Sequence, residues 1–203
     1  MTNFTYSKDL PDDLDLGNIV AVDCETMGLK PIRDRLCVVQ LSSGDGHTHI
    51  VQIEKDQTRA LNLARLLQDK NILKLFHFGR FDIAILYSTF GILSLPVYCT
   101  KIASKIARTY TDRHGLKNLL TELLEIDISK QQQSSDWGAK TLTKAQIEYA
   151  ASDVLHLHAL REILNEMLER ENRADLANEC FKFLPFRATL DIKGWNDIDI
   201  FEH

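Results

Sequence analysis

The sequence predicts an α/β protein with a mixed central sheet of about five strands flanked by helices. Three observations lead to this class. Short apolar and β-branched runs separated by turn residues fill the first quarter of the chain, as is typical of strands. Strand-like and helix-like patterns then alternate, and after residue 143 the apolar residues recur at helical spacing. This order of elements is typical of layered α/β proteins.

The first three strands are expected at residues 18–23, 35–41 and 48–53. The segment 42–46, rich in Ser and Gly, marks a short turn between the second and the third. Because strands joined by short turns pair antiparallel, we expect these three to form an antiparallel meander.

The middle of the chain predicts a helix around residues 61–67, with Thr58 as its N-cap residue. A fourth strand follows over 72–78, then a buried helix over 81–90 and a short fifth strand over 97–100. Alternation of this kind adds strands to one sheet and covers that sheet with helices.

The later residues predict helices and one polar loop, which we expect to be mobile. The helices cover 101–109, 116–125, 143 to about 170 and a shorter stretch to about 183, and the loop covers 129–136. Without repeats or linkers, the pattern predicts one domain over 1–203. Its parts are an acidic lead (1–16), a core (17–170) and a C-terminal helix with an acidic tail (171–203).

Composition and charge narrow the class of protein. Hydrophobic residues at 44 % and charged residues at 26 % are ordinary for a folded protein. No apolar run approaches the roughly 18 residues of a membrane helix, the N-terminus lacks a signal-like pattern, and the four cysteines are widely separated. We therefore expect a cytoplasmic protein with reduced thiols and no membrane partner.

The net charge of −5 argues against binding along the backbone of long nucleic acids.

Two acids end the first strand. Asp23 and Glu25 are two residues apart and point to the same face, whereas Cys24 points to the other face. Adjacent carboxylates repel each other unless a cation lies between them, and carboxylate oxygens are the ligands that Mg²⁺ and Mn²⁺ prefer. Because about one such pair is expected by chance in a chain this acidic, the pair alone also fits a solvated strand end.

Two further acids strengthen the metal interpretation. Asp82 begins the helix after the fourth strand, and Asp153 lies on an apolar face of the long helix. Tyr149 precedes Asp153 by four residues and therefore lies on the same helical face. Taken alone, each of these acids also fits a role as the acceptor of a buried hydrogen bond or as a helix cap. Four such acids on the elements of one α/β core favour a metal site.

Three segments together resemble a known family. Residues 22–26 (VDCET), 77–82 (HFGRFD) and 149–153 (YAASD) resemble the motifs of the DEDD 3′-5′ exonucleases, in the tyrosine-bearing subgroup that includes RNase D. Residues 34–41 and 114–119 are also RNase D-like. The resemblance covers about residues 17–170 and implies an RNase H-like exonuclease fold.

The chain is shorter than RNase D, which carries helical domains after the catalytic one. It is most similar to the compact bacterial nano-RNase C type, with further matches at 129–137 and 194–201. That resemblance implies a 3′-5′ exoribonuclease that cleaves short RNA, especially dinucleotides, and assembles into a homo-octamer. Its products would be nucleoside 5′-monophosphates.

The resemblance also implies a role for each motif residue. Two divalent ions, Mg²⁺ or Mn²⁺, would promote hydrolysis, with Asp23, Glu25 and Asp153 holding one ion and Asp23 bridging to a second near Asp82. A phenol of ordinary pKa, about 10, is a weak base at neutral pH, so we expect Tyr149 to orient the attacking water.

Further residues are candidates for contact with the substrate. For each of them an ordinary structural role, such as a surface apolar group, a core histidine or a solvated helix face, is an equal alternative. The candidates are Leu29, His77, Arg108, His114, Lys117, Lys130, Gln133 and Trp137.

Two other functions stay open. The first is a general exonuclease that trims the 3′ ends of longer RNA or DNA. The second is a non-catalytic nucleic-acid-binding protein on a degenerate exonuclease fold. The presence of all four acids and Tyr149 argues against the second, because degeneration usually removes a metal ligand.

Overall fold

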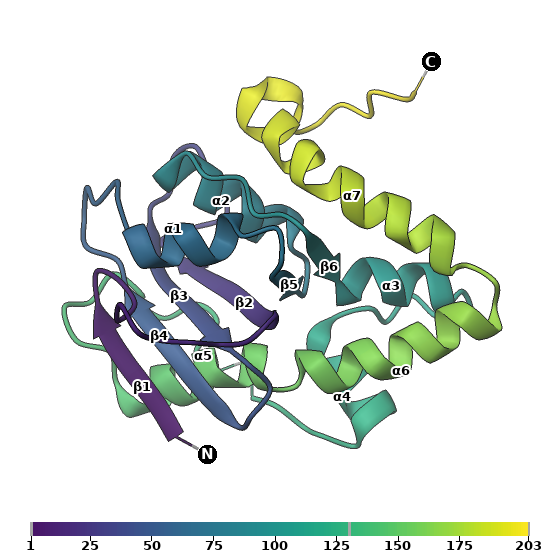
Figure 1. The fold of residues 1–203 in the computed structure, drawn as a ribbon, viewed down its shortest axis with the longest axis horizontal. Helices are drawn as coiled ribbons and strands as arrows, with labels where there is room; N and C mark the ends of the chain where they lie inside the picture. Colours follow the sequence, from purple (N-terminus) through teal and green to yellow (C-terminus); the bar gives the residue numbers. More distant parts are fainter. Residues whose placement is uncertain (1, 130, 203) are drawn as a thin grey trace.

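The computed structural model describes residues 2–129 and 131–202. Within these residues, the fold is a six-stranded mixed sheet with helices on both faces and a helical group beyond one edge (Figure 1). The strands are β1 (Thr2–Ser7), β2 (Ile19–Thr26), β3 (Leu36–Ser42), β4 (His47–Gln52), β5 (Leu73–Phe76) and β6 (Val97–Cys99). The helices are α1 (Leu61–Gln68), α2 (Arg80–Phe90), α3 (Thr100–Ala107), α4 (Leu116–Leu124), α5 (Lys144–Leu155), α6 (Leu157–Arg170) and α7 (Ala174–Leu190), and a helical turn over Asp191–Trp195 follows.

The strands lie in the order β1-β4-β3-β2-β5-β6. β2, β3 and β4 form the expected antiparallel meander, and β5 and β6 extend the sheet in parallel from β2. Every residue of β3 is buried, because helices cover both faces of the sheet (Figure 1). The mixed α/β class is thus confirmed.

The expected number of strands was too low. Residues 2–7, which we assigned to an acidic lead, form an edge strand that pairs in parallel with β4. Phe4 and Tyr6 stack on the His49 ring, with centroid distances of 5.1 and 5.9 Å. The segment lacks a continuous apolar run because one of its faces stays exposed, and this kept its strand pattern weak.

The start of α1 also differs from the prediction. Ala60, and not Thr58, is the N-cap residue, and it provides no side-chain cap. The cap comes instead from Asp9, whose carboxylate accepts hydrogen bonds from the backbone N–H groups of Asn62 (2.9 Å) and Leu63 (3.0 Å). A residue more than fifty positions away satisfies the first turn of the helix.

The expected long helix is two helices that meet at His156. α5 begins at Thr143 with a capping box to Gln146, as its sequence predicts. α5 packs on the sheet, whereas α6 packs on α3 and α4 beyond β6. One straight helix could not make both sets of contacts. The last helix also continues to Leu190, beyond the predicted end near 183.

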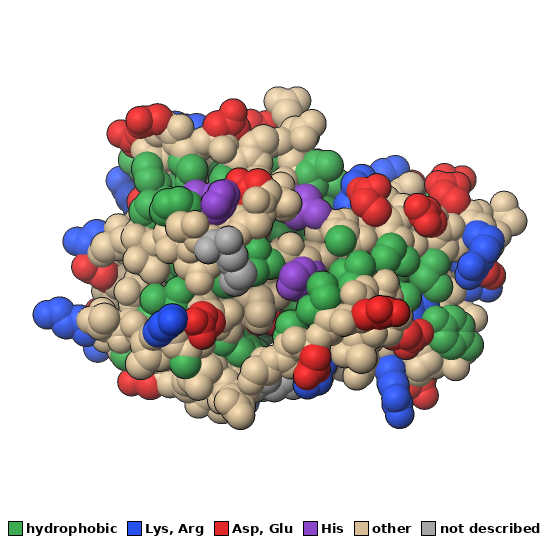
Figure 2. All heavy atoms as spheres, turned by 90° about the horizontal axis from the view of Figure 1, so that it is seen from below, with side chains coloured by type: hydrophobic (Ala, Val, Ile, Leu, Met, Phe, Trp, Pro, Cys, Tyr) green, Lys and Arg blue, Asp and Glu red, His purple; other side chains and the backbone are tan. Residues whose placement is uncertain are grey.

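Figure 2 shows the face of the molecule seen from below Figure 1. Acidic and basic side chains are interspersed on this face, without a broad basic surface. In the part of the chain that the structure describes, no helix combines the length and the apolar character needed to cross a membrane.

Candidate active site

Three acids from two elements converge beside the end of β2. Asp23 and Glu25 project from β2 toward α5, which carries Asp153. Carboxylate oxygens of these three residues all lie within 4.8 Å of one another. The cluster arises because β2 places its two acids on one face, and α5 packs across that face.

Asp82, on α2, lies near the three acids, and its charge contributes to the raised pKa of Asp23. It lies in the first turn of α2 and is 3 % exposed. Its carboxylate accepts hydrogen bonds from the backbone N–H and the thiol of Cys24. Cys24 therefore faces away from Asp23 and Glu25, as the strand alternation predicts, and it ties α2 to β2.

Burial and mutual repulsion favour the protonated forms of these acids. Burial, followed by the charges of Asp82, Asp153 and Glu25, raises the pKa of Asp23 well above its usual range. The pKa of Glu25 rises to about 9, mainly through burial and then through Asp153. Burial is also the largest cause that raises the pKa of Asp82 to about 8. Such a cluster is unstable as a set of bare anions.

A divalent cation fits this cluster. The donors are all carboxylate oxygens, the set that Mg²⁺ prefers, and a cation between them would offset the repulsion that raises their pKa values. The sequence-based interpretation of these acids as metal ligands therefore agrees with the geometry.

Gln40 supports the cluster, and our sequence reasoning missed its role. It faces Asp23 across the β2–β3 ladder, is fully buried, and donates from Nε2 to Asp23 Oδ2 at 2.8 Å. Hydrogen bonds of this kind orient ligand oxygens. A signal was available, because Gln40 is a polar residue between the apolar residues Val39 and Leu41 and lies in the RNase D-like segment 34–41.

Tyr149 lies one turn before Asp153 and donates a hydrogen bond to that carboxylate. Burial, followed by the charge of Asp153, raises the pKa of Tyr149 far above its ordinary value. The phenol therefore keeps its proton at neutral pH. Trp137 packs on Tyr149 with ring centroids 5.9 Å apart, so the segment after the polar loop fixes the position of the phenol ring.

Asp23, Glu25 and Asp153 line a cavity of about 610 Å³, whereas Asp82 is not part of its wall. Its wall combines the loop after β2, the turn after β5, the start of α3 and the loop before α5. Five of the predicted substrate contacts line it: Leu29, His77, Lys117, Gln133 and Trp137. The Leu29 side chain is 85 % exposed and is therefore accessible to a ligand. Trp137, in contrast, is buried. A second cavity of similar volume, between α6, α7 and the loop before β6, contains none of the four acids.

The polar loop is held against α5. Gln146 Nε2 donates to Ser135 Oγ at 3.1 Å and to the carbonyl of Asp136 at 3.0 Å. Gln133 and Trp137 thereby reach the cavity wall. Lys130 lies outside the described residues. Phe78 and Lys101 also line the cavity, and our sequence reasoning overlooked both.

Two predicted substrate contacts, Arg108 and His114, make contacts within the protein, away from the cavity wall. Arg108 is fully buried; its guanidinium pairs with Glu122 and donates to Ser104 Oγ and to the carbonyl of Arg113, both at 3.0 Å. His114 Nδ1 lies 2.8 Å from Ser104 Oγ. Neither Arg108 nor His114 lines the cavity. The basic stretch suggested a phosphate contact, but the Arg108 side chain turns inward and joins α3 to α4 through Glu122, and His114 contacts Ser104 on α3.

A family model described as "3'-5' exonuclease" matches residues 4–169. The chain belongs to this 3′-5′ exonuclease family of enzymes, in its RNase D-like branch. Curated relatives named Ribonuclease D agree: the chain is 36 % identical to the one from Gluconacetobacter diazotrophicus over 77 % of this chain and 39 % of the relative. The relative from Granulibacter bethesdensis is 36 % identical over 84 % of this chain and 42 % of its own. The chain thus spans about two fifths of these relatives.

Similarity to solved structures is more extensive. Brucella melitensis NrnC with bound Mg²⁺ is 55 % identical, covers 100 % of both chains and has a TM-score of 0.96. The same protein bound to pGG is 56 % identical over 100 % of this chain and 99 % of that one, with a TM-score of 0.97. Escherichia coli RNase D, at 24 % identity and a TM-score of 0.74 over 89 % of this chain and 48 % of that one, shares the fold. The resemblance drawn from the three motifs is confirmed, as is the RNase H-like exonuclease fold.

Proposed function

We propose that the protein is a metal-dependent 3′-5′ exoribonuclease that hydrolyses short RNA, especially dinucleotides, to nucleoside 5′-monophosphates. The observation that carries this proposal is the convergence of Asp23, Glu25 and Asp153 within 4.8 Å inside the cavity of about 610 Å³. The NrnC structures with Mg²⁺ and with pGG support both the cation and the short substrate.

Asp23, Glu25 and Asp153 would hold one Mg²⁺ or Mn²⁺ ion, and Asp82 with Asp23 would hold a second. When bound, such ions stabilise negative charge on the attacking and leaving oxygens of a phosphodiester. Asp82 stands outside the group of three that meets the 4.8 Å limit, which is consistent with a separate second position.

The chain itself positions the reacting groups. Gln40 holds the Asp23 carboxylate in one orientation through the 2.8 Å hydrogen bond. Tyr149 keeps its proton on the phenol oxygen, so we assign it the orientation of the attacking water and not the removal of a proton. Trp137 limits the rotation of the phenol ring.

The wall of the cavity beside the acids favours a short RNA substrate over a long one. The loop after β2 and the loop before α5 both border the acids. Binding along a long nucleic acid needs many cationic contacts, which a net charge of −5 does not favour.

We also propose that the chain assembles into a homo-oligomer, an octamer by resemblance. Large apolar side chains near the C-terminus stay exposed, including Phe186 at 55 %, Ile198 at 53 % and Phe201 at 74 %. Exposed apolar groups that gather at one end are typical of an association surface. Sedimentation at several protein concentrations tests this proposal, and a monomer throughout would contradict it.

The decisive experiment compares the turnover of pGG with that of a long single-stranded RNA in Mg²⁺ and in Mn²⁺. We expect the dinucleotide to be cleaved faster and to release nucleoside 5′-monophosphates. Faster cleavage of the long RNA would favour a general exonuclease, the function suggested by the Ribonuclease D relatives. No product from either RNA would favour the non-catalytic alternative.

A further inference from the structure

The turn between β5 and α2 is tightly constrained. Phe78 has a φ of 65°, in the left-handed region that bulky side chains rarely adopt. Gly79 follows it, and a Cβ atom there would lie 2.6 Å from Phe76 Cβ. Gly79 is also the N-cap residue of α2 and provides no side-chain cap. Such a conformation persists only where surrounding contacts hold it.

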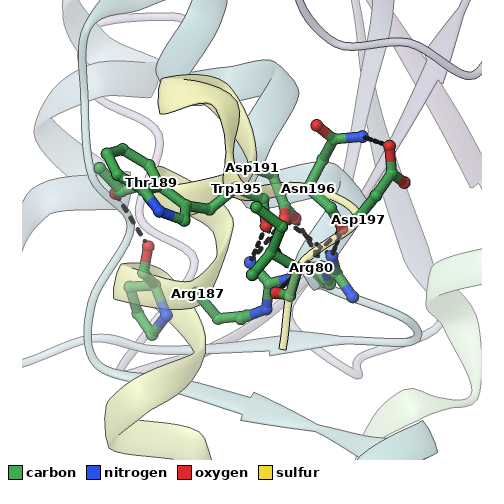
Figure 3. A network of polar contacts seen from close by, with 9 residues as sticks. Arg80, Arg187, Thr189, Asp191, Trp195, Asn196 and Asp197 are labelled. Atoms are coloured by element: carbon green, nitrogen blue, oxygen red, sulfur yellow. Dashed lines mark hydrogen bonds and ion pairs between the residues drawn. The ribbon is translucent and has the colours of Figure 1, made fainter. Parts of the chain in front are cut away.

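The C-terminal segment supplies such contacts through Arg80, the first residue of α2. Arg80 Nε donates to Asp191 Oδ2 at 2.6 Å and Arg80 Nη2 donates to Asp191 Oδ1 at 2.7 Å, a bidentate pair (Figure 3). Arg80 Nη2 also donates to the carbonyl of Asn196 at 2.9 Å. These bonds connect the start of α2 to residues more than a hundred positions away.

A second arginine also contacts the Asp191 carboxylate, at the Oδ1 atom that accepts from Arg80 Nη2. Arg187 Nη1 donates to Asp191 Oδ1 at 2.8 Å, and its guanidinium reaches the carbonyls of Trp195 (3.2 Å) and Ile198 (3.4 Å). The Asp191 side chain is only 13 % exposed. Two-pronged, partly buried arginine–carboxylate pairs are rigid. We call Arg80, Asp191 and Arg187 the C-terminal clamp (Figure 3).

The C-terminal clamp contacts α2, the helix that carries Asp82. Asp82 is two residues after Arg80, in the same first turn of α2. The helical turn at Asp191–Trp195 and α7 both pack on α2. A shift of this first turn would therefore move the Asp82 carboxylate relative to Asp23.

We propose that Asp191 and Arg80 are positioning residues that hold Asp82 in place for the second divalent cation. This proposal rests on the proposed function only for the identity of the cation site. It gives the C-terminal segment a role in metal affinity, separate from any role in association.

Mn²⁺ binding to the full-length protein without substrate, measured by calorimetry, tests the proposal. We expect Asp191→Asn to weaken the site that Asp82 serves by about tenfold, the scale typical of residues that support a metal ligand. Asp199→Asn removes the same charge from the same segment without touching the clamp, because its carboxylate accepts from the Phe201 N–H group. It should bind Mn²⁺ as the unmodified protein does.

A double-mutant cycle separates positioning from a general loss of structure. Because Asp191 acts through Asp82, adding Asp191→Asn to Asp82→Asn should weaken Mn²⁺ binding no further. Arg80→Lys keeps the charge but loses the bidentate geometry, and it should show a smaller loss than Asp191→Asn. Unchanged Mn²⁺ affinity in both Asp191→Asn and Arg80→Lys, or full additivity with Asp82→Asn, would overturn the proposal.

The hydrolysis assay gives an independent readout. In Asp191→Asn we expect the Mg²⁺ concentration for half-maximal cleavage of pGG to rise by about tenfold, while the KM for pGG stays close to that of the unmodified protein. A rise in KM alone would contradict positioning of a metal ligand. If the unmodified protein cleaves no RNA, the proposed function fails, but the calorimetric cycle still decides the role of the clamp.

Discussion

Gln40 donates a 2.8 Å hydrogen bond to Asp23 across the β2–β3 ladder, and it does so from a fully buried position. The bond involves Asp23 Oδ2, and the other carboxylate oxygen, Oδ1, receives no hydrogen bond from Gln40. A buried amide that contacts the central acid of the cluster is suited to orient that acid before any ion or substrate arrives.

Replacing Gln40 with Met should therefore lower activity without unfolding the protein. We expect the turnover of pGG at limiting Mg²⁺ to fall by about tenfold to a hundredfold. Thr48→Val is a matched control, because Thr48 is also buried in the sheet and donates to Asn3 Oδ1 at 2.7 Å, away from the acids. It should lower stability without changing Mg²⁺ dependence. Equal Mg²⁺ dependence in the two variants would contradict the role of Gln40.

The acid cluster makes the stability of the metal-free protein depend on pH. The pKa values of Glu25 and Asp82 rise from 4.5 and 3.8 to about 9 and about 8. The folded state thus holds protons that the unfolded chain releases, so the free energy of unfolding falls as pH rises from about 4 to about 9.

Thermal melting in a chelator over this pH range tests this dependence. The melting temperature should fall as pH rises, and the gain on adding Mg²⁺ should be larger at high pH, where the acids are anions. A melting temperature that stays constant or rises toward pH 9 in the chelator would show that the acids do not interact as described.

Tyr149→Phe should reduce kcat for pGG by about a hundredfold, while Mn²⁺ affinity stays nearly unchanged. The phenol keeps its proton because burial and Asp153 raise its pKa, so the loss should be the same from neutral to mildly alkaline pH. Tyr87→Phe, a substitution on α2 outside the cavity wall, is the control. A loss that grows as pH rises, as the phenol begins to lose its proton, would assign Tyr149 a role as a base.

Arg108→Met should lower stability and leave substrate affinity unchanged. The substitution removes the hydrogen bonds to Glu122, Ser104 and the Arg113 carbonyl, and we expect a loss of about 1–3 kcal/mol in the free energy of unfolding. Urea unfolding measures this loss, and the KM for pGG provides the comparison. A tenfold rise in KM at unchanged stability would restore the original prediction that Arg108 contacts substrate.

Local spacing determined much of the site. The two-residue period of a strand placed Asp23 and Glu25 on one face, and the four-residue step on α5 placed Tyr149 beside Asp153. The capping box at Thr143 and the antiparallel meander were also readable, because each depends on residues that are close in the chain.

The remaining features of the fold and the site depend on how the helices and strands pack against one another. Only the complete sheet brings residues 2–7 to the β4 edge and lets Asp9 cap α1. Only the helical group beyond β6 turns Arg108 inward, away from the cavity. The sequence by itself determined which residues share a face of one element, because backbone periodicity is local. The tertiary structure decided which elements meet, and with it the contacts of Gln40 with Asp23 and of Asp191 with Arg80, because those contacts depend on the burial of many distant residues at once.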